Sequence, residues 1–128
     1  PETLVLGELP APVAEAGSVV IDVHACAINF PDTLIIEDRY QFKPPRPFAP
    51  GGEVAGVVSA VGEGVTHLKV GDRVIAGCGN GGLAEQVATR ASNAYLLPER
   101  FSFAEGSALL MTYGTSIPAL VDRGRMQA

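Results

Sequence analysis

Two side chains that can do chemistry lie close together in the first third of this 128-residue chain, Asn29 and Tyr40. Asn29 follows a β-branched run and precedes Phe30-Pro31, so we expect its amide at a strand end, facing a cleft. Tyr40 begins a loop, where its hydroxyl can donate a proton or polarise a carbonyl if water is excluded. The alternative is that the Tyr40 ring packs against the protein body without a chemical role. Asp32, between them, is predicted to cap a short helix.

The segment from Gly77 to Gly82 reads Gly-Cys-Gly-Asn-Gly-Gly and satisfies the G-x-G-x-x-G pattern of dinucleotide-phosphate loops. Such a loop requires a strand before it and a helix after it. A β-branched run does precede the segment, but residues 83–89 alternate like a strand. We therefore interpret the segment as a glycine-rich connection between two strands.

Metal and serine chemistry find little support in the sequence. The chain has two cysteines and two histidines, widely spaced: Cys26, Cys78, His24 and His67. A structural zinc site usually takes four ligands and a catalytic site three protein ligands. Cys78, His24 and Glu53 are the one set of three residues whose side-chain types leave a catalytic zinc site open. We expect no metal ion, and we expect the two cysteines to be reduced. The sequence contains no G-x-S-x-G motif, so it does not predict a serine nucleophile.

The composition fits one soluble domain with a hydrophobic core. Hydrophobic residues make up 47% of the chain and charged residues 18%, and the net charge is −5. This acidic balance argues against nucleic-acid binding, which needs a basic face to neutralise phosphates. No apolar run approaches the roughly 20 residues of a membrane helix, and residues 1–3 do not open a signal peptide. We therefore expect a cytoplasmic protein with no membrane partner.

The first two thirds of the chain read as a β protein, with glycine and proline bracketing short apolar runs. Strands are predicted at residues 19–26, 52–61, 70–76, 83–89 and 94–97. In the first of them Val19, Ile21 and Val23 are predicted to face one side, and His24 and Cys26 the other. Short strands at this spacing indicate a small sandwich or barrel rather than βαβ units.

Two regions depart from the β pattern. A short helix is predicted at residues 33–37, and the proline-rich stretch 43–50 that follows is expected to form a surface loop. After Pro98, Ser102 and Glu105 have the spacing of a capping box, which predicts a helix at residues 103–110. A second helix is predicted at 115–123, ended by Gly124.

Four motifs occur in register along the chain. They are Asn29-Phe30-Pro31-Asp32, the run from Pro50 to Val58, Val70-Gly71-Asp72-Arg73-Val74, and the run from Gly81 to Val87. Their order and spacing resemble the zinc-independent quinone oxidoreductase branch of the medium-chain dehydrogenase/reductase superfamily. Residues 111–120 also resemble the stretch that leads into the nucleotide-binding domain of that family.

The resemblance implies a mainly β, GroES-like, partly open β-barrel with a few short helices. It places the catalytic domain at residues 1–98, without the first strand of the family, and a helical segment at 99–128 that leads to a Rossmann domain absent from this chain. The full-length enzyme would bind NADPH between its two domains and form a homodimer. Zinc-containing relatives have metal ligands where this chain has Asn29, Gly52 and Met111, so the resemblance implies a zinc-free enzyme.

The same resemblance assigns roles to three residues. Asn29 and Thr115 would lie near the nicotinamide, and Tyr40 resembles the catalytic tyrosine of related enoyl-thioester reductases. The expected activity is hydride transfer from NADPH to a quinone, enone or other conjugated carbonyl, with Tyr40 and Asn29 as the catalytic residues. Leu34 and Ile117 stand where some relatives have aromatic residues, which leaves the substrate open.

The 128 residues alone are expected to be inactive, since the nucleotide domain is the expected source of the firm cofactor contacts. The sequence leaves the choice between NADPH and NADH open for the same reason. The alternative function is a stand-alone GroES-like binding or assembly module without catalysis.

Overall fold

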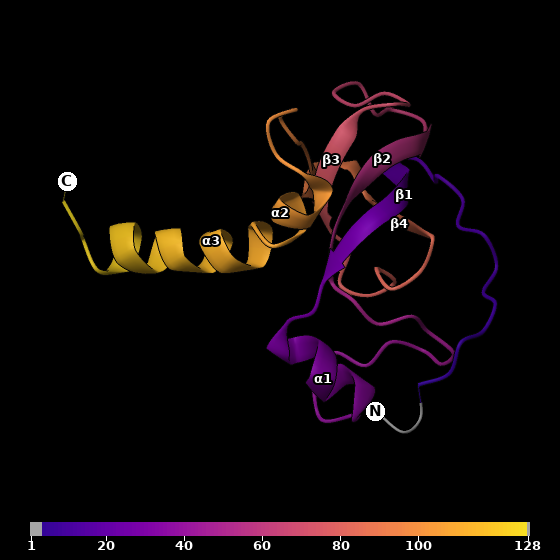
Figure 1. Cartoon of the computed structure of the whole chain (residues 1–128), viewed down its shortest axis with the longest axis horizontal. Coiled ribbons are helices and arrows are strands. Elements are labelled where there is room, and N and C mark those ends of the chain that lie inside the picture. The colour runs from indigo at the N-terminus through magenta and orange to yellow at the C-terminus, as the bar shows by residue number, and fades with distance from the viewer. Residues whose placement is uncertain (1–3, 128) are drawn as a thin grey trace.

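Five antiparallel strands form one open sheet in the order β4-β1-β2-β3-β5. The computed structural model describes residues 4–127. The strands are β1 (Ser18–Ala27), β2 (Glu53–Val61), β3 (Arg73–Gly77), β4 (Gln86–Arg90) and β5 (Ala94–Leu96). Figure 1 shows the curled sheet as the body of the molecule, with a long helix projecting from it. The predicted mainly β, partly open barrel is confirmed.

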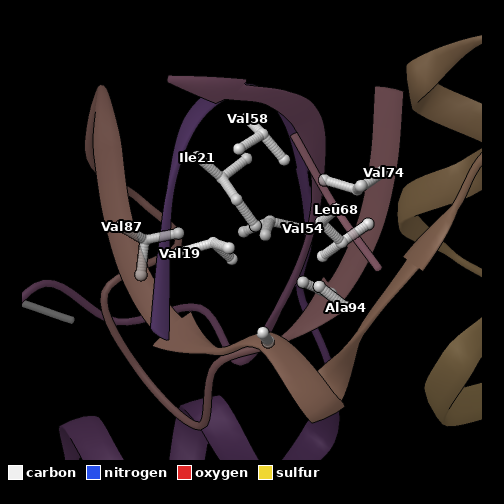
Figure 2. Close-up of a cluster of buried hydrophobic side chains, with 10 residues drawn as sticks. Val19, Ile21, Val54, Val58, Leu68, Val74, Val87 and Ala94 are labelled. Atoms are coloured by element: carbon white, nitrogen blue, oxygen red, sulfur yellow. The ribbon is translucent and has the colours of Figure 1, made fainter. Parts of the chain in front are cut away.

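One apolar cluster fills the interior of the curled sheet, and every strand contributes to it. Figure 2 shows these side chains pointing into the space that the strands enclose: Val19, Ile21, Val54, Val58, Leu68, Val74, Val87 and Ala94. Full burial of a valine, leucine or isoleucine contributes roughly 1.5–3 kcal/mol. This cluster therefore gives the chain a core of its own and a rigid base for the loops at the ends of the strands.

A bulge in β1 changes the face on which the last residues of the strand lie. Val23 pairs with Gly56 but Ala25 pairs with Ala55, so His24 is an extra residue in β1. An extra residue reverses the alternation of faces beyond it. Cys26 consequently packs against the same cluster as Val19 and Ile21, and the prediction that it faces the opposite side is wrong.

The third and fourth strands begin later than predicted, at Arg73 and Gln86. The chain enters β3 through a tight turn in which Gly71 has a φ of +91°, a conformation that favours glycine. The backbone N–H groups of Gly71 and Cys78 bond to carbonyls of residues 58 and 52, so both ends of β3 are tied to β2 or its approach.

The first helix, α1 (Phe30–Ile36), begins three residues earlier than predicted. Asn29 is its N-cap, and Asp32 is the third helical residue rather than the cap. The Asp32 carboxylate accepts the backbone N–H of Asn29 at 2.7 Å, which is the return contact of a capping box. The sequence pattern located the correct carboxylate but placed it at the wrong position of the cap.

The C-terminal helices are α2 (Phe103–Ser107) and α3 (Leu110–Ile117), the latter continued by a π-helical segment, η2 (Pro118–Arg123). The Ser102–Glu105 capping box is confirmed, since the Glu105 N–H bonds to Ser102 Oγ at 3.2 Å. The predicted boundaries are wrong, because the first helix ends at Ser107 and the second begins five residues before 115. No residue of α3 or η2 is buried, and both extend away from the sheet in Figure 1.

Within residues 4–127 we find no helix with both the length and the apolar character needed to cross a bilayer.

Candidate functional site

Glu53 is a fully enclosed carboxylate at the first position of β2, with an exposed fraction of 2%. A buried carboxylate is costly unless hydrogen bonds compensate for the lost water. Its Oε1 accepts hydrogen bonds from two backbone N–H groups, those of Leu110 and Met111, and the distance to the Met111 nitrogen is 3.2 Å. These residues open α3, whose N-terminus favours negative charge. Glu53 therefore anchors the start of α3 to the sheet.

Asn29 reaches the same carboxylate from the other side. Its Nδ2 donates to Oε2 of Glu53 at 3.2 Å. The register of the sheet explains this contact, because Ala27 pairs with Glu53 at the end of β1 and Asn29 follows two residues later. Asn29 therefore lies two residues beyond the end of β1 rather than at its last position, and the expectation that its amide faces a cleft stays a prediction.

Asp32 completes a compact polar cluster with these two residues. Its exposed fraction is 3%, and a Cβ built on Gly52 would lie 3.7 Å from its Oδ1. Asp32 holds the Asn29 backbone through the capping box, while Glu53 holds the Asn29 side chain. The Asn29 amide is therefore constrained from both its main chain and its tip.

Thr115 lies one helical turn beyond Met111 on α3 and is exposed. Within the described part of the chain its hydroxyl makes no hydrogen bond with another residue. The structure therefore joins Asn29 to the helix that carries Thr115, with Glu53 as the link. It does not place the two side chains in contact.

Tyr40 lies four residues after the end of α1 and is half-buried. Among residues 4–127 no hydrogen bond connects its hydroxyl to Asn29, Glu53 or Thr115. The structure therefore does not assemble Tyr40 with the other predicted site residues, and its chemical role stays a prediction.

The approach to Glu53 is held by the glycine-rich segment that mimics a phosphate loop. Cys78 N–H bonds to the Gly52 carbonyl at 2.9 Å, and Gly82 N–H bonds to the Gly51 carbonyl at 2.9 Å. Gly77 ends β3 and the next element is β4. The prediction that this segment joins two strands is confirmed, and it supports the backbone that leads into Glu53.

Both thiols lie next to Gly51 and are uncrosslinked. Cys78 Sγ is 3.4 Å from the Gly51 carbonyl oxygen, and a Cβ on Gly51 would lie 2.5 Å from Cys26 Sγ. Burial, followed by the negative charge of Asp32, raises the pKa of Cys26 to about 11. Burial, followed by the influence of Cys26, raises the pKa of Cys78 to about 12. Thiols of this kind are protonated at neutral pH and react slowly.

The ligand set that the sequence left open is not assembled. Across residues 4–127 no three His, Cys, Asp or Glu side chains are arranged to hold a metal ion. His24 is exposed and stacks on Phe103, with 4.4 Å between the ring centroids. This position explains why His24 does not join Cys78 and Glu53.

Glu53 was considered from the sequence only as a possible metal ligand, and its role in holding Asn29 and α3 was not predicted. One signal was available: a carboxylate stands between Gly51-Gly52 and the apolar run that begins at Val54. Glutamate is almost never fully buried without partners. A buried glutamate at the start of a central strand therefore predicts donors from elsewhere in the chain, but not that they come from a backbone 57 residues away.

Comparison with known proteins gives a consistent family. Residues 15–99 match the alcohol dehydrogenase GroES-like domain. The chain is 42% identical over 118 residues to quinone oxidoreductase-like protein 2 of Rattus norvegicus, covering 92% of this chain and 33% of that protein.

Two solved structures show the same fold. A probable oxidoreductase from Mycobacterium abscessus superposes with a TM-score of 0.92 at 42% identity, covering 99% of this chain and 41% of that one. Escherichia coli quinone oxidoreductase, solved in complex with NADPH, gives a TM-score of 0.76 at 32% identity, with coverage of 89% and 35%. The chain therefore spans between a third and about two fifths of the length of these relatives.

Proposed function

Because this chain belongs to the family of alcohol dehydrogenase GroES-like domains, and its homologues are quinone oxidoreductases of the medium-chain superfamily, we propose that it is the catalytic-domain part of a zinc-independent, NADPH-dependent reductase. The proposed reaction is hydride transfer to a quinone or another conjugated carbonyl. The proposal assigns residues 1–98 to the catalytic domain and 99–128 to a segment leading to a nucleotide domain. It includes a homodimeric, cytoplasmic full-length enzyme.

The observation that carries the proposal is the set of donors around Glu53. Its carboxylate accepts hydrogen bonds from the Asn29 amide and from the backbone of Leu110 and Met111. Asn29 supplies a neutral amide rather than a thiolate or imidazole, the ligands that zinc favours. The carboxylate is thus committed to organising the polypeptide, which supports a site that works without zinc.

The residues present fit the nicotinamide end of NADPH. Asn29 offers an amide oxygen, and Thr115 offers an exposed hydroxyl with no protein partner in the described structure. When bound, NADPH supplies the hydride. The function of Asn29 and Thr115 in this proposal is to orient the ring by hydrogen bonds, because alignment of the reacting atoms lowers the barrier.

The surroundings of Asn29 suit an apolar substrate. Its two neighbours in the chain, Ile28 and Phe30, have exposed fractions of 57% and 74%. Binding sites for small organic molecules combine apolar walls with a few polar groups that set orientation. Tyr40, in our proposal, polarises the substrate oxygen or delivers the proton that the reduced substrate requires.

A chimera tests the function. In it, residues 1–128 replace the matching part of E. coli quinone oxidoreductase, so that this chain is joined to a nucleotide-binding domain from a protein that binds NADPH. We expect the chimera to oxidise NADPH when 1,4-benzoquinone or 2-cyclohexenone is present, at a rate that EDTA does not change. An Asn29→Ala chimera is the matched control and should be slower. A folded chimera that binds NADPH but reduces neither substrate would favour the binding or assembly module.

A further inference from the structure

Glu53 makes contacts that determine more than the position of a helix. We infer that Glu53 is a positioning residue that fixes which end of the Asn29 amide is available to a ligand, so that Asn29 recognises a hydrogen-bond donor. The identity of that donor as the carboxamide of a nicotinamide rests on the proposed function, whereas the orientation of the amide does not.

The two side chains differ in the hydrogen bonds that they can make. An amide has a donor end, Nδ2, and an acceptor end, Oδ1, whereas a carboxylate only accepts hydrogen bonds. Glu53 already receives two backbone N–H groups on Oε1. Its Oε2 faces Asn29 at 3.2 Å, and the amide can satisfy that oxygen only through Nδ2.

The opposite orientation of the amide is disfavoured. A flip would bring Oδ1 against Glu53 Oε2, with two acceptors in contact inside a nearly enclosed cluster. At the N-terminus of α1 the Asp32 carboxylate accepts the Asn29 backbone N–H at 2.7 Å, which holds the main chain of Asn29 in place. The contact with Glu53 therefore selects a single orientation of the amide.

The consequence is a specificity rule for the site. With one Nδ2 hydrogen donated to Glu53, the acceptor that Asn29 offers to a ligand is Oδ1, which has two lone pairs. Asn29 therefore recognises an N–H or O–H group, such as a primary carboxamide, through Oδ1.

NMR of the 128-residue chain tests the orientation without any ligand. We expect one Asn29 side-chain N–H to be shifted and protected from exchange, and both properties to be lost in Glu53→Gln, whose amide can itself donate. Asp22→Asn is the matched control, because Asp22 accepts from the Gln86 amide at 2.8 Å on the surface and its loss should leave Asn29 unchanged. An unprotected Asn29 side-chain amide in the wild-type chain would overturn the inference.

A pair of small ligands tests the specificity rule in the wild-type chain, so no variant has to fold. Nicotinamide carries N–H donors, and 3-acetylpyridine has the same ring and carbonyl without them. We expect nicotinamide to shift the Asn29 signals at concentrations about tenfold lower, the order of one hydrogen bond. Equal or stronger binding of 3-acetylpyridine at Asn29 would refute the rule. If neither ligand binds, the proposed nicotinamide site fails, and the exchange measurement still decides the orientation.

Discussion

The side chain of Asn29 donates a hydrogen bond to the carboxylate of Glu53, 24 residues further along the chain, at 3.2 Å. The same carboxylate receives the first N–H groups of α3. One buried charge thus joins the end of β1, the start of β2 and the helix that leaves the sheet. This arrangement explains how a small domain can fix the position of an amide that follows a strand.

Glu53→Ala should destabilise the chain and release α3. The change leaves three N–H donors without their acceptor, and a hydrogen bond to a charged group contributes roughly 1.5–3 kcal/mol. We expect the free energy of unfolding in urea to fall by at least ~2 kcal/mol, with faster amide exchange at Leu110 and Met111.

Glu63→Ala is the matched control for this prediction. Glu63 is exposed, and its carboxylate makes no hydrogen bond to another residue in the part of the chain that the structure describes. Surface substitutions of this kind change stability by about 0.5 kcal/mol or less. Similar losses for Glu53→Ala and Glu63→Ala would contradict the anchoring role of Glu53.

Gly56→Ala should disrupt the contact between β1 and β2. A Cβ at Gly56 would lie 2.0 Å from the backbone oxygen of Asp22, which cannot move aside as a flexible side chain can. Overpacking of this kind costs roughly 1–3 kcal/mol or more. Gly77→Ala is the comparison, because nothing lies within 4 Å of a Cβ there. Thermal unfolding should show a clearly lower midpoint for Gly56→Ala alone, and equal midpoints would show that the strands tolerate separation.

The strands, the Ser102 cap and the strand-connecting role of the glycine-rich segment were predictable from the sequence because they depend on local patterns. The bulge at His24 was not, because it depends on the pairing of Val23 and Ala25 with β2. The contact of Glu53 with Leu110 was not either, since 57 residues separate them and only the fold brings them together. The start of α3 was misplaced for a related reason: its first N–H groups are capped by Glu53 rather than by a neighbour in the sequence.

Cys26 and Cys78 should resist thiol reagents. The pKa of Cys26 is about 11 and that of Cys78 about 12. At pH 8 about one thousandth of Cys26 and about one ten-thousandth of Cys78 is therefore thiolate, which is the reactive form. We expect labelling by 5,5′-dithiobis(2-nitrobenzoic acid) to be far slower in the native chain than in urea. Labelling as fast in the native chain as in urea would show that the thiols are not enclosed.

The same pKa shifts predict how stability varies with alkaline pH. A thiol whose pKa is raised in the folded state stays protonated where the unfolded chain has already ionised, so unfolding becomes easier as pH rises above the ordinary value of 9.0. The free energy of unfolding should therefore fall between pH 9 and 11. The fall should be smaller in Cys78→Ala than in the wild type, and an identical pH profile would contradict the assignment of this loss to Cys78.

Tyr40→Phe should lower kcat of the chimera. General acid–base groups typically contribute about 10²- to 10⁴-fold to rate, and the substitution removes only the hydroxyl. Tyr95→Phe is the control, because Tyr95 lies exposed on the edge strand β5. Unchanged turnover in Tyr40→Phe would remove Tyr40 from the mechanism and leave its ring as a packing element of the loop.

The most direct test of the account is the fate of the hydride in the chimera. NADPH carrying deuterium at the transferable position of C4 is supplied with 2-cyclohexenone, and the product is analysed by mass spectrometry. We expect cyclohexanone with one deuterium at the carbon β to the carbonyl, formed equally well with EDTA present. Cyclohexanone without deuterium, no cyclohexanone from a folded chimera that binds NADPH, or activity that EDTA abolishes and zinc restores would contradict it.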